Sequence, residues 1–203
     1  VDNDPAMLSV AKELFAKIDD NDKARTEWFD CGAESLNLKP NEIDLCTLLQ
    51  GPNFLSDPKK VLKGVIGALR PSGRVVASAW DRVEENKGHF AIASALKKLG
   101  VQPALKPFSM GSPALLKDIF VGSGFVIENF YTEQKIISFN SVKEFVSGVA
   151  AGAPATRHAI SKLSLSKYED FFQMVEELLV DYSTTNGLKL PTQAHIVQAV
   201  PAP

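Results

Sequence analysis

The first third of the chain shows two patterns of hydrophobic residues, one typical of helices and the other of buried strands. Apolar residues recur every three or four positions between Pro5 and Ile18, which predicts an amphipathic helix that Asp4 caps. The same spacing returns after Asp57-Pro58 and continues to Leu69. Both helices thus begin with an aspartate followed by proline, whose missing N–H costs nothing at the first helical position.

Short apolar runs outside these helices predict strands. Trp28-Phe29 is read as a strand that ends near Cys31, and Ile43–Leu48 as a buried strand. The run RVVASAW follows a turn at 71–73 and predicts a further strand. The order strand, helix, strand with short connections favours an α/β fold, in which a parallel sheet carries helices on both faces.

Ligands of such sheets bind beside the carboxyl ends of the strands. The residues that follow the predicted strands are Asp2, the turn Cys31–Glu34, the turn Leu48–Gly51 and the pair Trp80-Asp81. We therefore expect these four segments to gather along one edge of the sheet.

The second half of the chain has a different organisation. Helices are predicted at 87–99 and from Ser112-Pro113 to Gly122, and strands at FVIENFY and KIISF. Ser141 caps the first of several helical stretches, and a turn at Asn186-Gly187 precedes a final strand, AHIVQAV. We expect one domain, with a core at 1–139, a helical lid at 140–185 and the last strand at 186–203. Its substrate pocket would have Trp80 and residues near Phe90 as floor.

The composition is that of an ordinary globular protein, with 45% hydrophobic and 23% charged residues among 203. A net charge of −2 gives no reason to expect nucleic acid as a partner, and no apolar run approaches a membrane span. Cys31 and Cys46 are expected to be reduced thiols of a cytoplasmic protein. No cluster of metal-ligating residues stands out, and no set of catalytic residues can be assigned.

Five segments resemble, in order, the motifs of a known family. They are VDNDPAML, CGAESLNL, IDLCTLLQGPNFLSDPKKVL, LRPSGRVVASAW and TTNGLKLPTQAHIVQAV. Together they are similar to the class I S-adenosylmethionine-dependent methyltransferases, in the small-molecule branch that includes quinone-biosynthesis methyltransferases. The resemblance covers nearly the whole chain and implies a Rossmann-like fold and S-adenosylmethionine as cofactor.

The resemblance also implies where the cofactor would be bound. The acid at the first motif's strand end would hold the ribose hydroxyls, and the second motif would contact the adenine. The cofactor-binding residues expected on this basis are Asp2, Asn3, Met7, Gly32, Ala33, Leu48 and Leu49. Gly32 stands where the family carries an acid for the adenine amino group, so one polar contact is missing. Trp80 and Phe90 are expected to face the substrate.

The function implied is methyl transfer to a small, apolar or aromatic molecule. Such a reaction needs no obligatory general base, because the sulfonium methyl group is already activated and the enzyme can act by positioning and by excluding water. The alternative is a catalytically silent fragment or binding module with the same fold. A nicotinamide-dependent oxidoreductase would need a G-x-G-x-x-G segment between strand and helix, which the chain does not contain.

The start of the chain leads to one more expectation. In the family, the strand that ends at Asp2 is the second, and the first carries a glycine-rich loop around the methionine part of the cofactor. We expect the 203 residues to be part of a longer natural chain or a product cut upstream. A chain that stands alone would pair Trp28-Phe29 with Ile43–Leu45, or fill the gap with a second copy as a homodimer.

Overall fold

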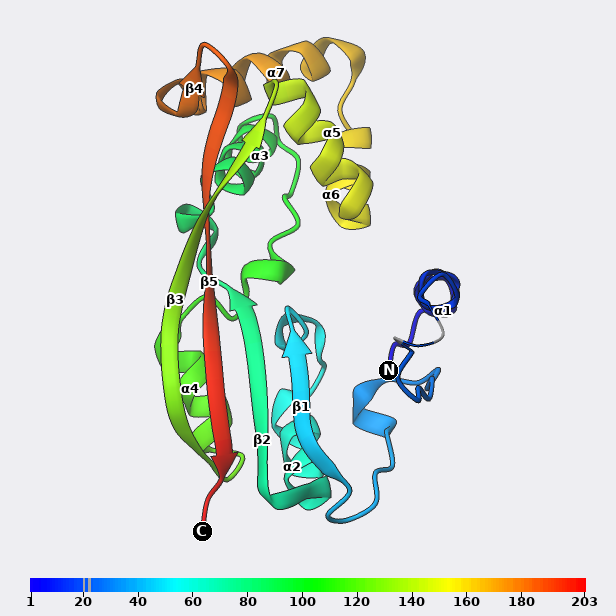
Figure 1. The fold of residues 1–203 in the computed structure, drawn as a ribbon. Helices are drawn as coiled ribbons and strands as arrows, with labels where there is room; N and C mark the ends of the chain where they lie inside the picture. The colour runs from blue at the N-terminus through cyan, green and yellow to red at the C-terminus, as the bar shows by residue number, and fades with distance from the viewer. Residues whose placement is uncertain (20, 22) are drawn as a thin grey trace.

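The computed structural model describes residues 1–203 except for 20 and 22. Its centre is a sheet with the strand order β1-β2-β5-β3, and a short β4 pairs with β5 (Figure 1). The strands are β1 (Ile43–Leu49), β2 (Leu69–Trp80), β3 (Phe125–Phe139), β4 (Ser183–Thr184) and β5 (Gly187–Pro201). The α/β fold is confirmed. A wholly parallel sheet is wrong, because β5 returns between β2 and β3 and runs antiparallel to both.

The described part of the chain forms seven α-helices. They are α1 (Pro5–Ala16), α2 (Pro58–Ala68), α3 (Lys87–Lys98), α4 (Pro113–Val121), α5 (Val142–Gly152), α6 (Pro154–Ser161) and α7 (Leu165–Leu178). The predicted caps are confirmed, because the side chains of Asp4, Asp57, Ser112 and Ser141 each accept a backbone N–H at the start of a helix. Short 3-10 helices are η1 (Ala33–Ser35), η2 (Pro52–Phe54), η3 (Val83–Glu85), η4 (Lys106–Phe108) and η5 (Val180–Tyr182).

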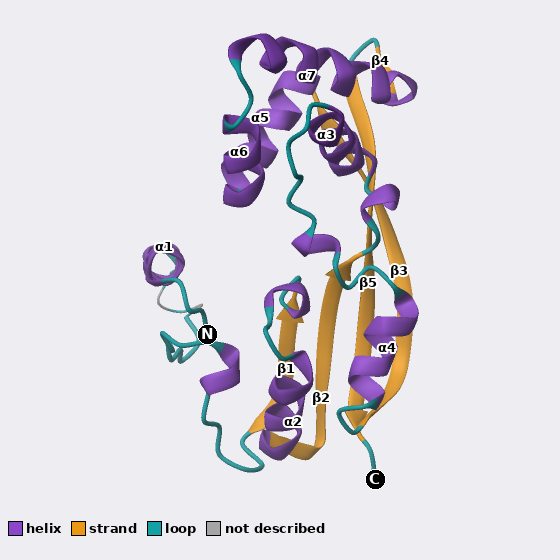
Figure 2. Ribbon diagram, turned by 180° about the vertical axis from the view of Figure 1, so that it is seen from behind, coloured by secondary structure: helices purple, strands orange, loops and turns teal. Residues whose placement is uncertain are grey.

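The buried apolar residues form two cores. In the lower core, α2 and α4 pack on the same face of the sheet (Figure 2). This core consists of residues such as Leu62 and Val65 from α2, Val75 and Ala77 from β2, Leu116 and Phe120 from α4, and Val197 and Ala199 from β5. Alternate residues of a strand point to opposite faces, so the intervening side chains of β2, among them Trp80, lie on the other face.

The upper core lies where β3 and β5 extend beyond β2 (Figure 1). It joins α3, α5, α6 and α7 to the first part of β5 through residues such as Ile92, Leu96, Phe145, Phe171, Val175, Leu188 and Leu190. Because β5 supplies residues to both cores, it fixes the helices of the upper core above the carboxyl ends of β1 and β2.

Two predicted strands differ from what is observed. Trp28-Phe29 forms no strand; the segment makes one isolated parallel bridge, between Asp2 and Asp30. The bridge consists of the Asp2 N–H donating to the Phe29 carbonyl at 3.2 Å and the Cys31 N–H donating to the Asp2 carbonyl at 3.1 Å. Two hydrogen bonds are too few to extend a ladder. The alternative pairing of Trp28-Phe29 with Ile43–Leu45 is not present either.

The strand β1 forms where it was predicted, but it is not buried. It is an edge strand of the sheet, and only one of its faces packs on the lower core, through Cys46 and Leu48. On its other face Leu45 is 52% exposed and Leu49 is 68% exposed. An apolar run alone does not tell an edge strand from a central one, which is why the sequence reading failed here.

Two predicted boundaries also shift. The turn at 71–73 does not separate α2 from the next strand, because β2 already begins at Leu69, which pairs with Ile43. Residues 71–73 instead lie in an irregular stretch of that pairing, before Arg74 pairs with Leu45. The runs FVIENFY and KIISF belong to one continuous strand, β3, with one irregularity between Ile127 and Asn129. In the part of the chain that is described, no helix is long and apolar enough to cross a membrane.

The predicted turn at Asn186-Gly187 is confirmed at the start of β5. Gly187 has a φ of +106°, and a Cβ atom there would lie 2.2 Å from the Phe139 carbonyl oxygen. A side chain at this position therefore meets both an unfavourable backbone conformation and a close backbone neighbour.

We expect Gly187→Ala to lower the free energy of unfolding by about 1–3 kcal/mol, the usual cost of such backbone strain. Gly64→Ala in α2 is the control, because a Cβ atom there meets nothing within 4 Å and alanine favours a helix. Urea unfolding of the two variants checks this expectation. Equal stabilities would show that the turn tolerates a side chain.

Candidate functional site

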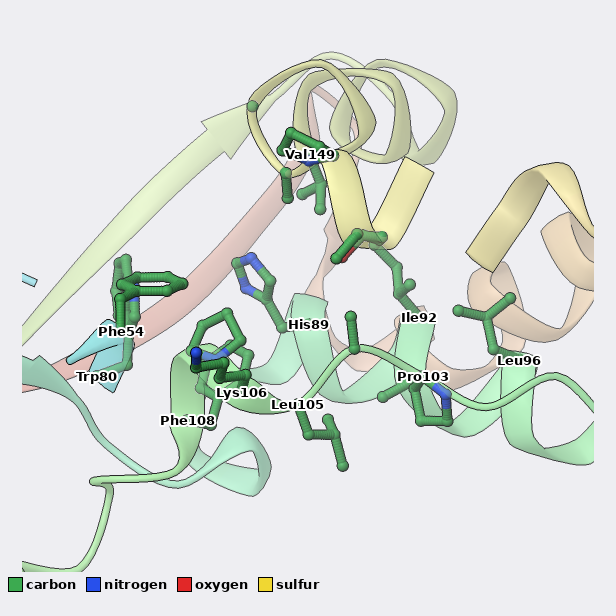
Figure 3. A pocket seen from close by; sticks show the side chains of 18 residues that line it. Phe54, Trp80, His89, Ile92, Leu96, Pro103, Leu105, Lys106, Phe108 and Val149 are labelled. Atoms are coloured by element: carbon green, nitrogen blue, oxygen red, sulfur yellow. The ribbon is translucent and has the colours of Figure 1, made fainter. Parts of the chain in front are cut away.

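A cavity of about 450 Å³ lies between the two cores, above the carboxyl end of β2 (Figure 3). Its walls come from η2, from α3, from the loop that contains η4, and from α5 and α6. The lining residues are Phe54, Trp80, His89, Ile92, Ala93, Leu96, Pro103–Phe108, Val149 and Gly152–Thr156. This volume lies in the range of pockets that hold small molecules, and the lining is mostly apolar.

Aromatic rings form one side of this cavity. His89 packs against Phe108 with ring centroids 5.3 Å apart and against Trp80 at 6.2 Å. Phe145 contacts the same imidazole edge-on at 6.1 Å. Trp80 comes from the last position of β2 and Phe108 from η4, so the cluster joins the sheet, the loop and α3.

Burial lowers the pKa of His89, because the charged imidazolium would lose its hydration among these rings. The side chain is therefore neutral at pH 7. A neutral imidazole has one nitrogen that donates a hydrogen bond and one that accepts.

A second cavity, of about 330 Å³, lies against the first. The two share Trp80, His89 and Val149 in their walls. The second is otherwise lined by residues of β3, α5 and β5, including Ile137, Phe139, Phe145, Leu190 and Thr192, and by Asn86 and Gly88 at the start of α3. The shared residues thus separate two adjoining spaces.

Asn86 holds the start of α3, from which His89 projects. Its side-chain amide donates to the carbonyls of Asp81 and Arg82, at 3.2 Å and 3.1 Å. Its oxygen accepts the hydroxyl of Thr192 at 2.6 Å and the N–H of Gln193 at 3.0 Å. Asn86 is only 1% exposed, and these four bonds attach the β2–α3 connection to β5.

His195 holds the loop before α4 in a similar way. Its Nε2 lies 3.1 Å from the Gly111 carbonyl and 3.2 Å from a carboxylate oxygen of Asp81. Both are acceptors, so Nε2 carries a hydrogen and donates, and Nδ1 lies within hydrogen-bond distance of the Thr132 hydroxyl, at 2.9 Å. A Cβ atom on Gly111 would lie 2.4 Å from the Arg82 nitrogen, so only glycine allows this close approach.

The residues expected to bind the cofactor fall into two groups. Asp2, Asn3 and Met7 lie at or beside the start of α1, and the bridge to Asp30 brings Gly32 and Ala33 next to Asp2. One carboxylate oxygen of Asp2 accepts the Asp4 N–H at 2.9 Å. The other group, Leu48 and Leu49, ends β1. None of the seven residues in these two groups lines the cavities described above.

Glu34 joins the first group to the rest of the molecule. Its carboxylate accepts the backbone N–H of Ser56 at 2.7 Å, just before α2. Hydrogen bonds from backbone N–H groups, its own first and then that of Ser56, lower the pKa of Glu34. Ala33 packs against the lower core. The turn at Cys31–Glu34 is therefore docked on α2 rather than on β1.

Of the two residues expected to face the substrate, only one lines a cavity. Trp80 lines both cavities, whereas Phe90 lines neither and is 37% exposed. Because consecutive helical positions point about 100° apart, it is the preceding residue, His89, that faces the cavity. Part of the segment 140–182 does lie opposite Trp80, through Val149 and Gly152–Thr156. That these residues bind a substrate stays a prediction.

Several residues of this region were missed by sequence reasoning. Phe54 and Phe108 lie in 3-10 turns, where no periodicity marks them. Asn53 is 2% exposed; its amide donates to the Pro107 carbonyl at 2.5 Å, and its oxygen has no partner among the described residues. Gln50 also has an unpartnered buried oxygen and a φ of +54°. Its left-handed backbone after an apolar strand is the kind of outlier that clusters at functional sites.

Comparison with known protein families finds a match to the first part of the chain. Residues 1–77 match a family described as "Methyltransferase domain". The match covers less than half of the chain and shows what this segment is similar to. That description agrees with the resemblance of the motifs, over the first 77 of the 203 residues. No curated protein matches the chain.

Solved structures share the fold at low sequence identity. A Bacillus halodurans C-125 protein assigned as a methyltransferase has a TM-score of 0.60 at 10% identity, over 97% of this chain and 79% of that one. A SAM-dependent methyltransferase of Methanosarcina mazei has a TM-score of 0.54 at 11% identity, over 99% and 80% of the two chains. The cyclase SpnF has a TM-score of 0.52 at 15% identity, over 98% and 65%. At such identities the likeness establishes the fold and nothing finer.

Removing the Asn86 side chain should weaken the attachment of α3. Asn86→Ala leaves buried carbonyls and donors without partners, at about 1–3 kcal/mol for each group that water does not reach. We expect the free energy of unfolding to fall by at least about 2 kcal/mol. Asn129→Ala is the control, because Asn129 bonds Gln198 at an exposed position. Urea unfolding measures both, and a loss no larger than the control's would contradict the role given to Asn86.

The free energy of unfolding should decrease as the pH is lowered, because His89 is buried. Below about pH 6.5 an unfolded histidine takes up a proton. In the folded protein His89 takes up a proton only when the pH reaches its lowered pKa. Between the pKa of the unfolded and of the folded state, the free energy of unfolding therefore declines as the pH falls. His89→Gln should flatten this decline, whereas His158→Gln at an exposed position of α6 should keep it. Urea unfolding at about pH 7.5 and pH 5.5 tests this, and parallel curves for all three proteins would refute it.

Proposed function

We propose that this protein transfers the methyl group of S-adenosylmethionine to a small, apolar or aromatic molecule bound in the cavity beside Trp80. The observation that carries the acceptor class is the lining of that cavity, which is aromatic and aliphatic and has no carboxylate. In sheets of this type ligands bind beyond the carboxyl ends of the strands, and the cavity lies beyond β2.

The proposal assigns the cofactor to Asp2, Gly32, Ala33, Leu48 and Leu49, with Asn3 and Met7 beside them. Its support is the bridge that brings Asp2 next to the turn of Gly32 and Ala33. One nucleoside could then contact Asp2 through its ribose and the turn through its adenine. The carboxylate of Asp2 keeps one oxygen that receives no hydrogen bond from the described residues. The bound cofactor would supply an activated methyl group on a sulfonium.

The residues of this chain would act by positioning and by keeping water out. Trp80 and Phe108 present flat apolar surfaces that orient a planar acceptor. The helices α5 and α6 close the cavity from above, and we propose that 140–185 acts as its lid. The quinone-methyltransferase branch and a cytoplasmic location are parts of the same proposal. The free thiols of Cys31 and Cys46 support a reducing compartment.

The second candidate is a binding module that carries out no methyl transfer. The observation in its favour is that none of the seven expected cofactor residues lines a described cavity, and that Gly32 offers no side chain to the adenine. The structural likeness to a cyclase is a reminder that this fold also serves other chemistry. A single-turnover assay with labelled cofactor separates the two candidates once an acceptor is known.

Titration calorimetry with S-adenosylmethionine tests the leading proposal directly. We expect binding heat, and a loss of about tenfold or more in affinity for Asp2→Ala, because hydrogen bonds to a charged group contribute about 1.5–3 kcal/mol. Asp181→Asn, at an exposed position in η5, should leave the affinity unchanged. Absence of both binding heat and a thermal shift in the unmodified chain would reject the cofactor assignment.

A further inference from the structure

His89 is the polar group at the centre of the candidate site. It separates the cavities of about 450 Å³ and 330 Å³ and lines both. Figure 3 shows its imidazole projecting from α3 between Phe108 and Val149. A ligand that enters either space therefore meets this ring.

The hydrogen-bonding capacity of His89 is unused by the described residues. Its contacts are with the rings of Trp80, Phe108 and Phe145, and no described side chain or backbone group bonds its nitrogens. The ring is largely buried, and its nitrogens remain available to bond a molecule that enters either cavity. In the same region both ring nitrogens of His195 are bonded, whereas the side-chain oxygens of Asn53 and Gln50 have no partner among the described residues.

The other groups of the larger cavity restrict the chemistry of that partner. Besides His89, its polar side chains are the Trp80 indole, Thr156 and the exposed Lys106. No carboxylate faces the space to hold a cationic ligand. The rings of Trp80 and Phe108 favour a flat, uncharged molecule, which would stack or pack edge-on against them. The neutral imidazole adds one acceptor, which suits a single hydroxyl group.

We propose that the cavity binds a planar aromatic molecule that carries a hydroxyl group, and that this hydroxyl donates its hydrogen bond to His89. The inference rests on the proposed function, whose acceptor it narrows from any small apolar molecule to a phenol-like one. In this proposal His89 determines specificity. A ligand with a hydroxyl group at one position binds more tightly, and the hydrogen bond orients its ring against Trp80 and Phe108.

Binding of two matched probes tests this inference without any cofactor. 2-Naphthol and naphthalene have the same ring system, and only the first can donate a hydrogen bond. We expect the unmodified protein to bind 2-naphthol about 2–12-fold more tightly, the value of one net hydrogen bond of about 0.5–1.5 kcal/mol. The fluorescence of the ligands reports binding. 2-Naphthol gives up its proton in the excited state to a neighbouring base, so its bound form should emit partly as the naphtholate.

Three variants locate the effect. His89→Phe keeps an aromatic ring but removes the acceptor; it should abolish the preference or reverse it, and abolish the naphtholate emission. His89→Gln supplies an amide oxygen and should restore part of the preference. His158→Phe, at an exposed position of α6, should behave as the unmodified protein. Ala155→Trp, in the cavity wall, should weaken both probes and so show that they bind in this cavity.

The outcomes separate this inference from the proposed function. A preference for 2-naphthol that disappears in His89→Phe supports the inference, even if S-adenosylmethionine fails to bind and the methyltransferase proposal falls. Absence of binding, equal affinity of the two probes for the unmodified protein, or a preference that survives in His89→Phe each overturns it. Binding of S-adenosylmethionine in that case leaves the methyltransferase proposal standing, with an acceptor of another kind.

Discussion

The pairing of β5 between β2 and β3 is the interaction on which the rest of this structure depends. The strand contributes Val197 and Ala199 to the lower core and Leu188 and Leu190 to the upper core, so one continuous backbone fixes the distance between them. Its register against β3 runs without a break from Asn129–Gln198 to Phe139–Leu188. In a sheet, a shift by one residue would turn every one of these side chains to the opposite face. The register therefore specifies both cores at once.

The candidate site occupies the seam that this strand creates. Trp80 belongs to the sheet, His89 to the upper helices and Phe108 to the loop that returns to the lower helices. Three separate parts of the chain thus supply the aromatic wall, and Asn86 and His195 tie these parts to β5 through buried hydrogen bonds. Asn86 and His195, whose polar atoms are hydrogen-bonded, thus lie behind the larger cavity. The aromatic rings and His89 face it.

The sequence predicted the helices well because their signals are local. Four of them begin at an aspartate or serine cap that the structure confirms, and the stripe in 58–69 packs on the sheet as its spacing implied. The motifs also agree with the description of the family that residues 1–77 match. Strand environment was harder: β1 has an apolar run typical of a buried strand, yet it lies at an edge, and Trp28-Phe29 found only a bridge. Which strand lies beside which is decided by contacts that no window of sequence contains.

The site shows the same limit. Trp80 could be predicted because it ends a strand, and its neighbours on η2 and η4 could not, because a short turn carries no periodic signal. The choice between His89 and Phe90 depended on the rotation of α3, which Asn86 sets from within the fold. The two partners of Asn86 on β5, Thr192 and Gln193, are more than a hundred positions away in the chain, so their pairing appears only in three dimensions.

The position of β5 in the chain has a consequence for how the protein is made. β5 follows every other described strand and helix in the chain. Each core lacks the residues that β5 contributes until this strand has paired. During synthesis, 106 residues are added between the end of β2 at Trp80 and the start of β5 at Gly187, a delay of roughly five to twenty seconds at the usual elongation rates. The apolar sides of β2 and α3 stay open throughout that interval. The nascent chain is therefore a natural client for chaperones, and its native state is reached only after the last strand has been released.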